Sequence, residues 1–549
     1  MKLSDLALRR AAYAFLALPV FIFLLGFLRW YLAVPLALFL CVALLLAWRR
    51  SDGERKYLVL SRRGLLALFA VTAAWCFFAG LGNLYYQSDD WSARNAIFRD
   101  LITYRWPVIY PAKNAALVYY IGYWLPAALV GKLFLPLGED VAFSAGNVAL
   151  LVWSTLCICL VFLLLLMYLH TATRRACVLA VAVFIGFSGL DIIGTLCDVF
   201  FWSKEMPDHL EWWAFLFQYS SITTCLFWVF NQAVLAWVAT LTFLNEKGLS
   251  NRVLLLSCTL CAAPFAAVGL ALYMLGDFLF AVLCQKSFAA PLHSLCTPQN
   301  LIALFGITPV FCLYYATNLA VGMTGQGKVR KPLWQWLLLL FAVILLACAA
   351  VLLYRRLQKK PRPVTLLWVA TALIPLVAAF FTDRVCPLYF SFLLLECGIY
   401  LLALLLLGKK EPLYYLTTLS LLLCPLFVIG TSADFSMRVS IPAVTVLCVM
   451  CIRALLDHGN ALFQKPWSLR RAAVLLLAVA LCIGAVTPLF ELGRGIVAVC
   501  RAGELALVND SIGSFAQIFS GGIGSTDKNF IAYGYADTFF FKFFAKGVG

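Results

Sequence analysis

The sequence predicts an all-α, polytopic helical membrane protein with about 13–15 transmembrane helices. Hydrophobic residues make up 64% of the 549 residues and charged residues only 12%, whereas soluble domains carry about 25% charged residues. Many apolar runs are close to the ~20 residues with which an α-helix crosses a bilayer. The alternating segments of ~10 residues that are typical of a β-barrel are absent.

The net charge of +17 would suit a nucleic-acid-binding protein. The basic residues, however, lie in short loops between apolar runs, which is the positive-inside pattern of a membrane protein. We therefore expect membrane lipids as partners and no nucleic acid. The 20 Cys lie mostly inside apolar runs and the four His are scattered, so no metal site built from protein ligands alone is predicted.

The loop charges also predict the topology. The basic loop 49–63 is expected in the cytoplasm together with the N-terminus, so the span 64–82 leads outward. The stretch 114–134 is interpreted as an interfacial or re-entrant helix, because Arg174 and Arg175 would lie outside if it spanned. Residues 253–284 form one long span or two short ones broken near Pro264 and Gly269. We adopt the two-span interpretation because it keeps the later basic loops inside. The other expected spans are 11–28, 30–48, 141–169, 176–197, 222–244, 300–320, 334–354, 364–381, 388–407, 413–430, 440–456 and 472–489.

Four parts of the chain follow from this topology. They are an N-terminal hairpin with its basic loop (1–63), a catalytic module (64–284) with an outer loop at 83–140, further transmembrane helices (285–489), and an extracytoplasmic tail (490–549). Four polar segments then share the outer face: 86–113, 202–221, 382–387 and 431–440. We expect the functional residues to lie in these segments. The protein itself is expected in the plasma (inner) membrane.

The strongest candidate motif is Asp89–Asp90–Trp91, at the outer end of a span. Charges beside membrane spans are costly unless they line a cavity or take part in chemistry. A carboxylate here can accept the proton of an attacking hydroxyl as a general base, so Asp89 and Asp90 are the predicted catalytic residues. The segment also has helical spacing, and Asp90 with Arg94 forms an i,i+4 pair. In the alternative interpretation the acids only cap an interfacial helix, with Ser88 or Asp89 as the cap.

A second group of candidates holds aromatic rings beside a carboxylate, which suits a sugar. His209, Glu211, Trp212 and Trp213 lie in the second outer segment. An aromatic belt at the membrane interface is the alternative explanation.

Phosphate binding is predicted for arginines, whose guanidinium groups match phosphate oxygens. Arg384 and Arg438 lie in short outer turns at headgroup depth, and Arg94 and Arg99 lie near Asp90. Pairing of Arg384 with Asp383, and of Arg438 with Asp434, is the alternative. Trp91 completes the predicted substrate-binding residues.

The plan of residues 64–240 resembles the GT-C superfamily of membrane glycosyltransferases. In that family a span delivers an acidic motif into the first large outer loop, juxtamembrane helices follow, and a span returns inward. Here these parts are span 64–82, Asp89–Asp90–Trp91, the stretch 94–134 and span 141–169. The run PAKNAALVYYIGYWLPAALVGKLFLPLG is similar to the family stretch before its second helix. The hairpin 11–48 and the lack of a large soluble C-terminal domain depart from some family members.

The resemblance implies a polyprenyl-phosphate-linked sugar donor, inversion at the anomeric carbon and the motif Asp as base. The predicted function is transfer of a sugar to a glycan, lipid or protein acceptor on the extracytoplasmic face. The alternatives are a multi-span transporter or lipid-linked glycan flippase, and a membrane glycan polymerase or ligase. No cofactor is assigned, and a divalent metal beside Asp89 and Asp90 is left open.

Overall fold

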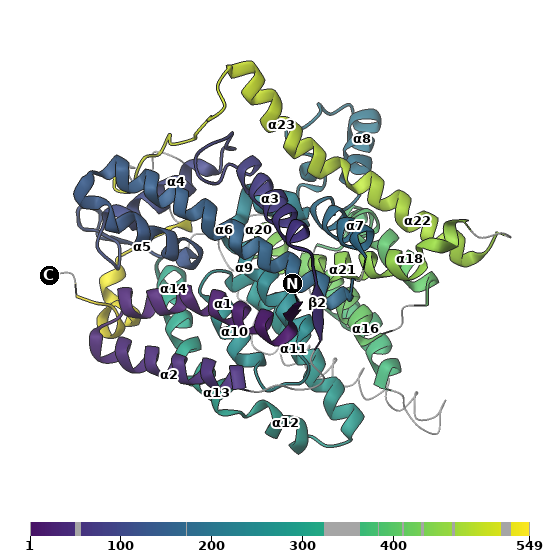
Figure 1. Cartoon of the computed structure of the whole chain (residues 1–549), viewed down its shortest axis with the longest axis horizontal. Helices are drawn as coiled ribbons and strands as arrows, with labels where there is room; N and C mark the ends of the chain where they lie inside the picture. The colour runs from purple at the N-terminus through teal and green to yellow at the C-terminus, as the bar shows by residue number, and fades with distance from the viewer. Residues whose placement is uncertain are drawn as a thin grey trace.

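The chain is a bundle of α-helices with a few very short strands (Figure 1). The computed structural model describes residues 2–49, 56–171, 173–322, 363–380, 382, 384–408, 411–429, 433–463, 467–517 and 529–547. Within these ranges, nine helices are long and apolar enough to cross a membrane. The chain is thus an all-α, multi-pass membrane protein. The expected span 334–354 lies outside the described residues.

The nine candidate spans are Asp5–Phe27, Trp30–Arg49, Glu139–Leu169, Ile222–Asn245, Pro264–Gln285, Pro298–Asn318, Pro387–Leu406, Ile441–Phe463 and Leu469–Ala502. The helices from α1 to α12 are α1 (Asp5–Phe27), α2 (Trp30–Arg49), α3 (Arg62–Phe78), α4 (Trp91–Thr103), α5 (Leu125–Leu133), α6 (Glu139–Leu169), α7 (Arg174–Ile185), α8 (Asp191–Trp202), α9 (Ile222–Asn245), α10 (Arg252–Leu260), α11 (Pro264–Gln285) and α12 (Ala289–Leu295). The later helices are α13 (Pro298–Ile302), α14 (Thr308–Gly322), α16 (Pro363–Phe380), α17 (Pro387–Leu393), α18 (Ile399–Leu406), α19 (Pro412–Leu423), α20 (Asp434–Val439), α21 (Ile441–His458), α22 (Leu469–Gly484) and α23 (Val486–Ala502). The strands are β1 (Lys2–Ser4), β2 (Tyr57–Val59), β3 (Ile109–Tyr110), β4 (Ala115–Leu117) and β5 (Ile531–Tyr533).

Several stretches differ from the expected continuous spans. The expected span 413–430 is the 12-residue helix α19 followed by a 3-10 turn, and the expected span 64–82 is the 17-residue helix α3, which ends at Phe78. The expected span 176–197 is two helices of 12 residues each, α7 and α8. The ambiguous region 253–284 is broken before Pro264, which takes the first position of α11, where its missing N–H costs nothing. The stretch 114–134 contains one nine-residue helix, α5, which is too short to cross a bilayer.

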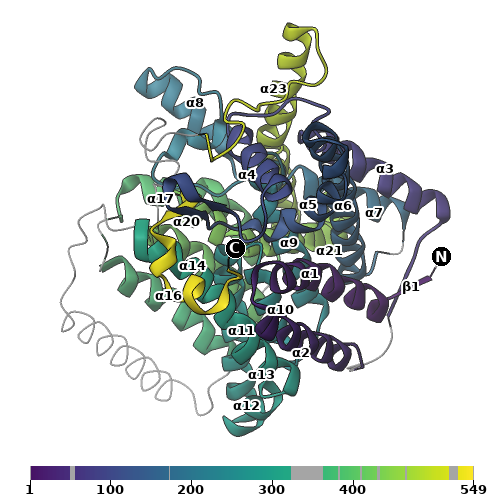
Figure 2. The same ribbon diagram turned by 90° about the vertical axis from the view of Figure 1, so that its left-hand side faces the viewer.

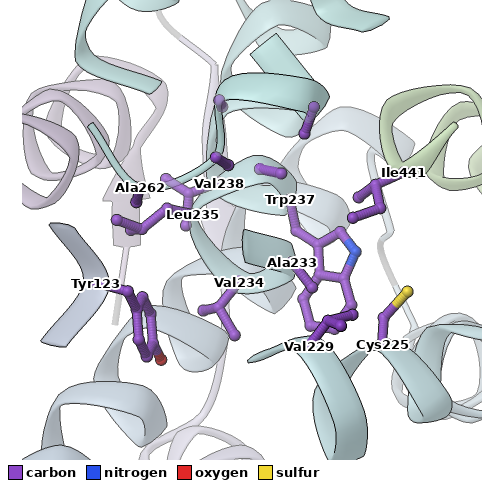
Figure 3. Packing of buried hydrophobic residues seen from close by; sticks show 14 of the residues in the cluster. Tyr123, Cys225, Val229, Ala233, Val234, Leu235, Trp237, Val238, Ala262 and Ile441 are labelled. Atoms are coloured by element: carbon purple, nitrogen blue, oxygen red, sulfur yellow. The ribbon is translucent and has the colours of Figure 1, made fainter. Parts of the chain in front are cut away.

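Helix α9 lies at the centre of the bundle. In its most apolar window, 94% of the residues are buried. The Trp237 ring stacks on that of Trp75 with a centroid distance of 6.0 Å. Figure 3 shows Trp237 on the side of α9 that faces Ile441, with Tyr123 on the opposite side. At Val229 the backbone leaves helical geometry (φ −135°, ψ 34°), so α9 is kinked there.

The C-terminal tail returns to the outer loop. From the end of α23 the chain runs back toward α4 (Figures 1 and 2). Strand β5 then pairs antiparallel with β4, which pairs with β3. In the aromatic segment after it, Phe540 is fully buried and packs against Phe23 and Tyr314, while Phe539 and Phe543 are exposed.

Candidate functional site

The motif Asp89–Asp90–Trp91 lies at the start of α4. Asp90 occupies the N-cap position but its side chain makes no capping hydrogen bond, and the carbonyl of Ser88 accepts from the Trp91 N–H at 3.0 Å. The expectation that the Ser88 or Asp89 side chain caps this helix is therefore wrong. The predicted i,i+4 pair is confirmed: Arg94 lies 3.1 Å from the Asp90 carboxylate. Asp89 and Asp90 are both exposed, while Arg94 is buried.

Trp91 anchors the motif to the kink in α9. Its Nε1 donates to the Phe227 carbonyl at 3.0 Å, and its ring stacks on Phe230 with a centroid distance of 4.9 Å. Because the kink at Val229 interrupts helical hydrogen bonding, carbonyls near it need other donors. Trp91 is only 2% exposed, so its predicted role in contacting substrate is corrected to one of positioning Asp89 and Asp90.

The tail holds the same loop from the other side. The Gln87 N–H donates to the Leu507 carbonyl at 3.1 Å. The Asn509 N–H donates to the Gln87 amide oxygen at 3.0 Å, and its side-chain amide donates to the carbonyls of Ser88 and Asp89 at 3.3 and 3.4 Å. These bonds fix the backbone from which both acids project.

Arg99 also belongs to this tail contact. Its guanidinium forms an ion pair with Asp510 and lies 4.0 Å over the Phe143 ring. Arg99 therefore connects α4 to the tail and to α6, and its binding of phosphate stays a prediction.

Asp100 is a buried carboxyl that joins loop and tail. It accepts hydrogen bonds from the Tyr110 hydroxyl at 2.6 Å, the Ser514 hydroxyl at 2.6 Å and the Phe515 N–H at 3.0 Å. Burial raises the pKa of Asp100, and these hydrogen bonds oppose the rise.

A second Asp–Arg pair comes from α20, far along the chain. Arg438 lies 2.8 Å from the Asp434 carboxylate, again at i,i+4. Burial disfavours the Arg438 charge, but Asp434, Tyr119 and Tyr120 outweigh it and raise the pKa of Arg438. Among the described residues, its buried Nε has no hydrogen-bond partner.

Both pairs act electrostatically on Tyr119. Burial raises the pKa of Tyr119, Arg438 and Arg94 lower it, and Asp434 and Asp90 raise it. All four side chains are thus within electrostatic range of one phenol. This cluster, the Tyr119 cluster, brings together three residues predicted from the sequence with two that were not predicted to act, Tyr119 and Asp434. The Asp434–Arg438 spacing, identical to that of Asp90–Arg94, was the available signal.

His209 forms a separate buried network. Its ring nitrogens lie 2.6 Å from Glu491 and 3.4 Å from Glu211, and Arg494 and Trp228 also bind Glu491. Burial opposes the charge of His209, but the two carboxylates outweigh it and raise the pKa of His209 to about 10. Burial likewise opposes the charge of Glu211, while His209 holds the pKa of Glu211 below its usual range. Sequence reasoning missed Glu491, which lies inside an apolar run.

The aromatic residues beside this network differ in exposure. Trp212 is 53% exposed and packs edge-on against His209. Trp213 is buried, and its Nε1 lies 3.4 Å from Glu396. His209, Glu211 and Trp213 are therefore packed into the protein, and their role in binding a sugar stays a prediction. Only Trp212 of this group presents a face to the outside.

Arg384 is held by backbone. Its guanidinium donates to the carbonyls of Leu216 at 2.6 Å and Pro425 at 3.2 Å and lies 5.0 Å over the Phe217 ring. Burial lowers the pKa of Arg384. These contacts give Arg384 a structural role, and its binding of phosphate stays a prediction. Its expected partner Asp383 lies outside the described residues.

Both polar centres lie near the start of α9. Cys225 is within electrostatic range of both Glu211 and Arg438. Within the described ranges, no group of three or more His, Cys, Asp or Glu side chains is arranged to hold a metal ion. Comparison of the chain with protein-family models, curated proteins and solved structures gives no match. The site must therefore be interpreted from its own chemistry.

Proposed function

We propose that this protein is a membrane glycosyltransferase that transfers a sugar from a polyprenyl-phosphate donor to an acceptor hydroxyl on the extracytoplasmic face, with inversion. The observation that carries the proposal is the Tyr119 cluster. It combines the exposed Asp90 carboxylate with two guanidinium groups, that of Arg94 on the same helix and that of Arg438 on the distant helix α20. The cluster lies at the motif whose surroundings resemble the GT-C plan.

In this mechanism the Asp90 carboxylate takes the proton of the acceptor hydroxyl. The hydroxyl oxygen bonds to the anomeric carbon as the bond from that carbon to the phosphate oxygen breaks, and polyprenyl phosphate leaves with the electron pair. Arg438 and Arg94 stabilise the charge of the phosphate. Asp90 is assigned as the base because it belongs to the Tyr119 cluster, and Asp89 is assigned to orienting the acceptor.

Single substitutions test the assignment. Membranes that contain Asp90→Asn should transfer sugar from polyprenyl-phosphate donors about 10²–10⁴ times more slowly than wild type, which is the usual contribution of a general base. Asp89→Asn should slow transfer less, and Asp537→Asn, an exposed acid in the tail, should match wild type. Full transfer by both Asp89→Asn and Asp90→Asn at normal protein levels would refute the catalytic assignment.

Topology has its own test. A cysteine at the exposed Asp89, introduced as Asp89→Cys, should react with an impermeant reagent added to the outside of intact cells. Reaction only in inverted vesicles would overturn the extracytoplasmic site and the mechanism together.

A transporter or lipid-linked glycan flippase is the second candidate, and α9 favours it. Two residues after its kink at Val229 come Asn231 and Gln232, both fully buried. Among the described residues, all four of their side-chain amide atoms lack hydrogen-bond partners. Interrupted helices and buried polar groups inside spans are features of transporters. Movement of labelled lipid-linked sugar across proteoliposomes by the Asp90→Asn variant, lost in Gln232→Leu, would support this candidate over the transferase.

A further inference from the structure

A groove with apolar walls and three cations lies beside the end of α1. Its volume is 720 Å³. One wall is the stripe Leu18, Phe21, Ile22 and Leu25, which has the i, i+3, i+4, i+7 spacing of a single helix face. Leu18 and Leu25 are 40% and 50% exposed, and α1 is a candidate membrane span. The apolar part of the groove therefore faces the bilayer.

The polar part of the groove carries only positive charge. Arg105, Lys132 and Lys546 line it, and none of its lining residues within the described ranges is acidic. Arg105 is exposed, and its guanidinium makes no hydrogen bond or ion pair within the described part of the chain. Lys546 is held over the groove by donating to the Leu25 carbonyl at 2.7 Å.

Lys132 is the most enclosed of the three cations. Its ammonium donates to the carbonyls of Ile102 and Tyr104 and lies 5.2 Å from the Trp106 ring centroid. Burial lowers the pKa of Lys132 to about 8. An anion in the groove would oppose this effect of burial and keep the ammonium charged.

We infer that this groove binds an anionic diacyl phospholipid, with an acyl chain along the α1 stripe and the phosphodiester at Arg105, Lys132 and Lys546. Basic pockets beside spans bind anionic headgroups by charge complementarity. Zwitterionic lipids fit the walls equally well but bring no net charge to the cations. The lipid is therefore selected by its headgroup.

The position of the groove separates this lipid from a reacting donor. Arg105 follows the C-terminal end of α4 and Asp90 precedes its start. Helix α4 has 13 residues, so the two ends are about 20 Å apart at 1.5 Å per residue. A phosphate at Arg105 is thus too far from Asp90 to react there. The bound phospholipid instead fixes α1, α5 and the tail against one another.

Photo-crosslinking in proteoliposomes of the full chain tests the inference. The probe is phosphatidylglycerol with a diazirine in one acyl chain, competed by unlabelled lipids. Label should appear on α1 between Leu18 and Leu25 or at Leu129 of α5. Phosphatidylglycerol should compete much better than phosphatidylcholine. Label confined to other segments, or equal competition by phosphatidylcholine, would overturn the inference.

Variants supply the second arm. The double variant Arg105→Gln with Lys546→Gln should weaken competition by phosphatidylglycerol roughly 30-fold, since each cation near a headgroup contributes about fivefold. The control double variant Lys247→Gln with Arg501→Gln removes two exposed cations elsewhere and should leave competition unchanged. An equal loss in both, or none in the first, would overturn the role of the groove cations. Polyprenyl phosphate that competes as well as phosphatidylglycerol would overturn the assignment to a diacyl phospholipid.

Discussion

The buried His209 network predicts that the protein loses stability in mildly alkaline solution. His209 lies between Glu491 and Glu211, and its pKa is raised from the ordinary 6.5 to about 10. A group whose pKa is higher in the folded state stabilises that state fully below its unfolded pKa. The contribution is then lost as the pH rises through the folded pKa.

The magnitude follows from these two pKa values. Proton linkage gives a contribution of about 4 kcal/mol to the free energy of unfolding near pH 7 and about 1 kcal/mol near pH 9. The charged groups that face the ring are Glu491, Glu211 and, through Glu491, Arg494. Wild type should therefore lose about 3 kcal/mol between the two pH values through this network.

The measurement compares variants by denaturant unfolding in detergent at the two pH values. In His209→Gln the side chain cannot be charged, so its free energy of unfolding should lie well below that of wild type near pH 7 and approach it near pH 9. His293→Gln, which changes an exposed His on α12, should follow wild type at both. Glu491→Gln should move the loss of stability to lower pH. A gap between wild type and His209→Gln that stays constant from pH 7 to 9 would refute the charged network.

Two further predictions concern packing around α9 and α20. Trp91→Phe keeps an aromatic ring but leaves the Phe227 carbonyl without its hydrogen-bond donor. The variant should therefore lose about 1–3 kcal/mol of the free energy of unfolding. An unchanged value would mean that water or structural relaxation replaces the hydrogen bond. Gly269→Ala places a methyl group 2.0 Å from the Val439 carbonyl oxygen, a backbone atom that cannot move aside, and should cost about 1–3 kcal/mol. Gly459→Ala, whose methyl would meet nothing within 4 Å, is the control, and equal unfolding by both variants would contradict this packing.

Features that depend on residues close together in the sequence were predicted well, because the interactions that produce them involve only those neighbours. The Asp90–Arg94 pair depends only on helical spacing. The break before Pro264 follows from the missing N–H of proline. The apolar runs indicated a multi-pass helical protein because the bilayer sets helix length.

Long-range contacts could not be read from the sequence. Ser514 binds Asp100 across 414 residues, and nothing in the composition of the tail marks it as the partner of α4. The Tyr119 cluster depends in the same way on α20 packing beside the outer loop. Such contacts are set by the tertiary fold, which local patterns do not encode.

Exposure was the other property that the sequence could not provide. A polar or aromatic residue at the end of a span gives the same pattern whether it faces water or packs inward. Trp212 and Trp213 are neighbours in sequence, yet the first is exposed and the second is buried. Glu211 and His209 looked available to a sugar, but Glu491 from an apolar run satisfies His209 inside the protein.

The kink of α9 links the two polar centres physically. The Phe227 carbonyl accepts a hydrogen bond from Trp91, which directly follows Asp90 in the sequence. The next residue, Trp228, donates to Glu491, and Glu491 in turn binds His209. A shift of this one turn must displace both centres. The double variant Trp91→Phe with Trp228→Phe should therefore be non-additive by at least about 0.5 kcal/mol in the free energy of unfolding. The effects of Trp91→Phe and the distant Gly459→Ala on the free energy of unfolding should be additive. Additivity in both double variants would show that the kink does not couple the two polar centres.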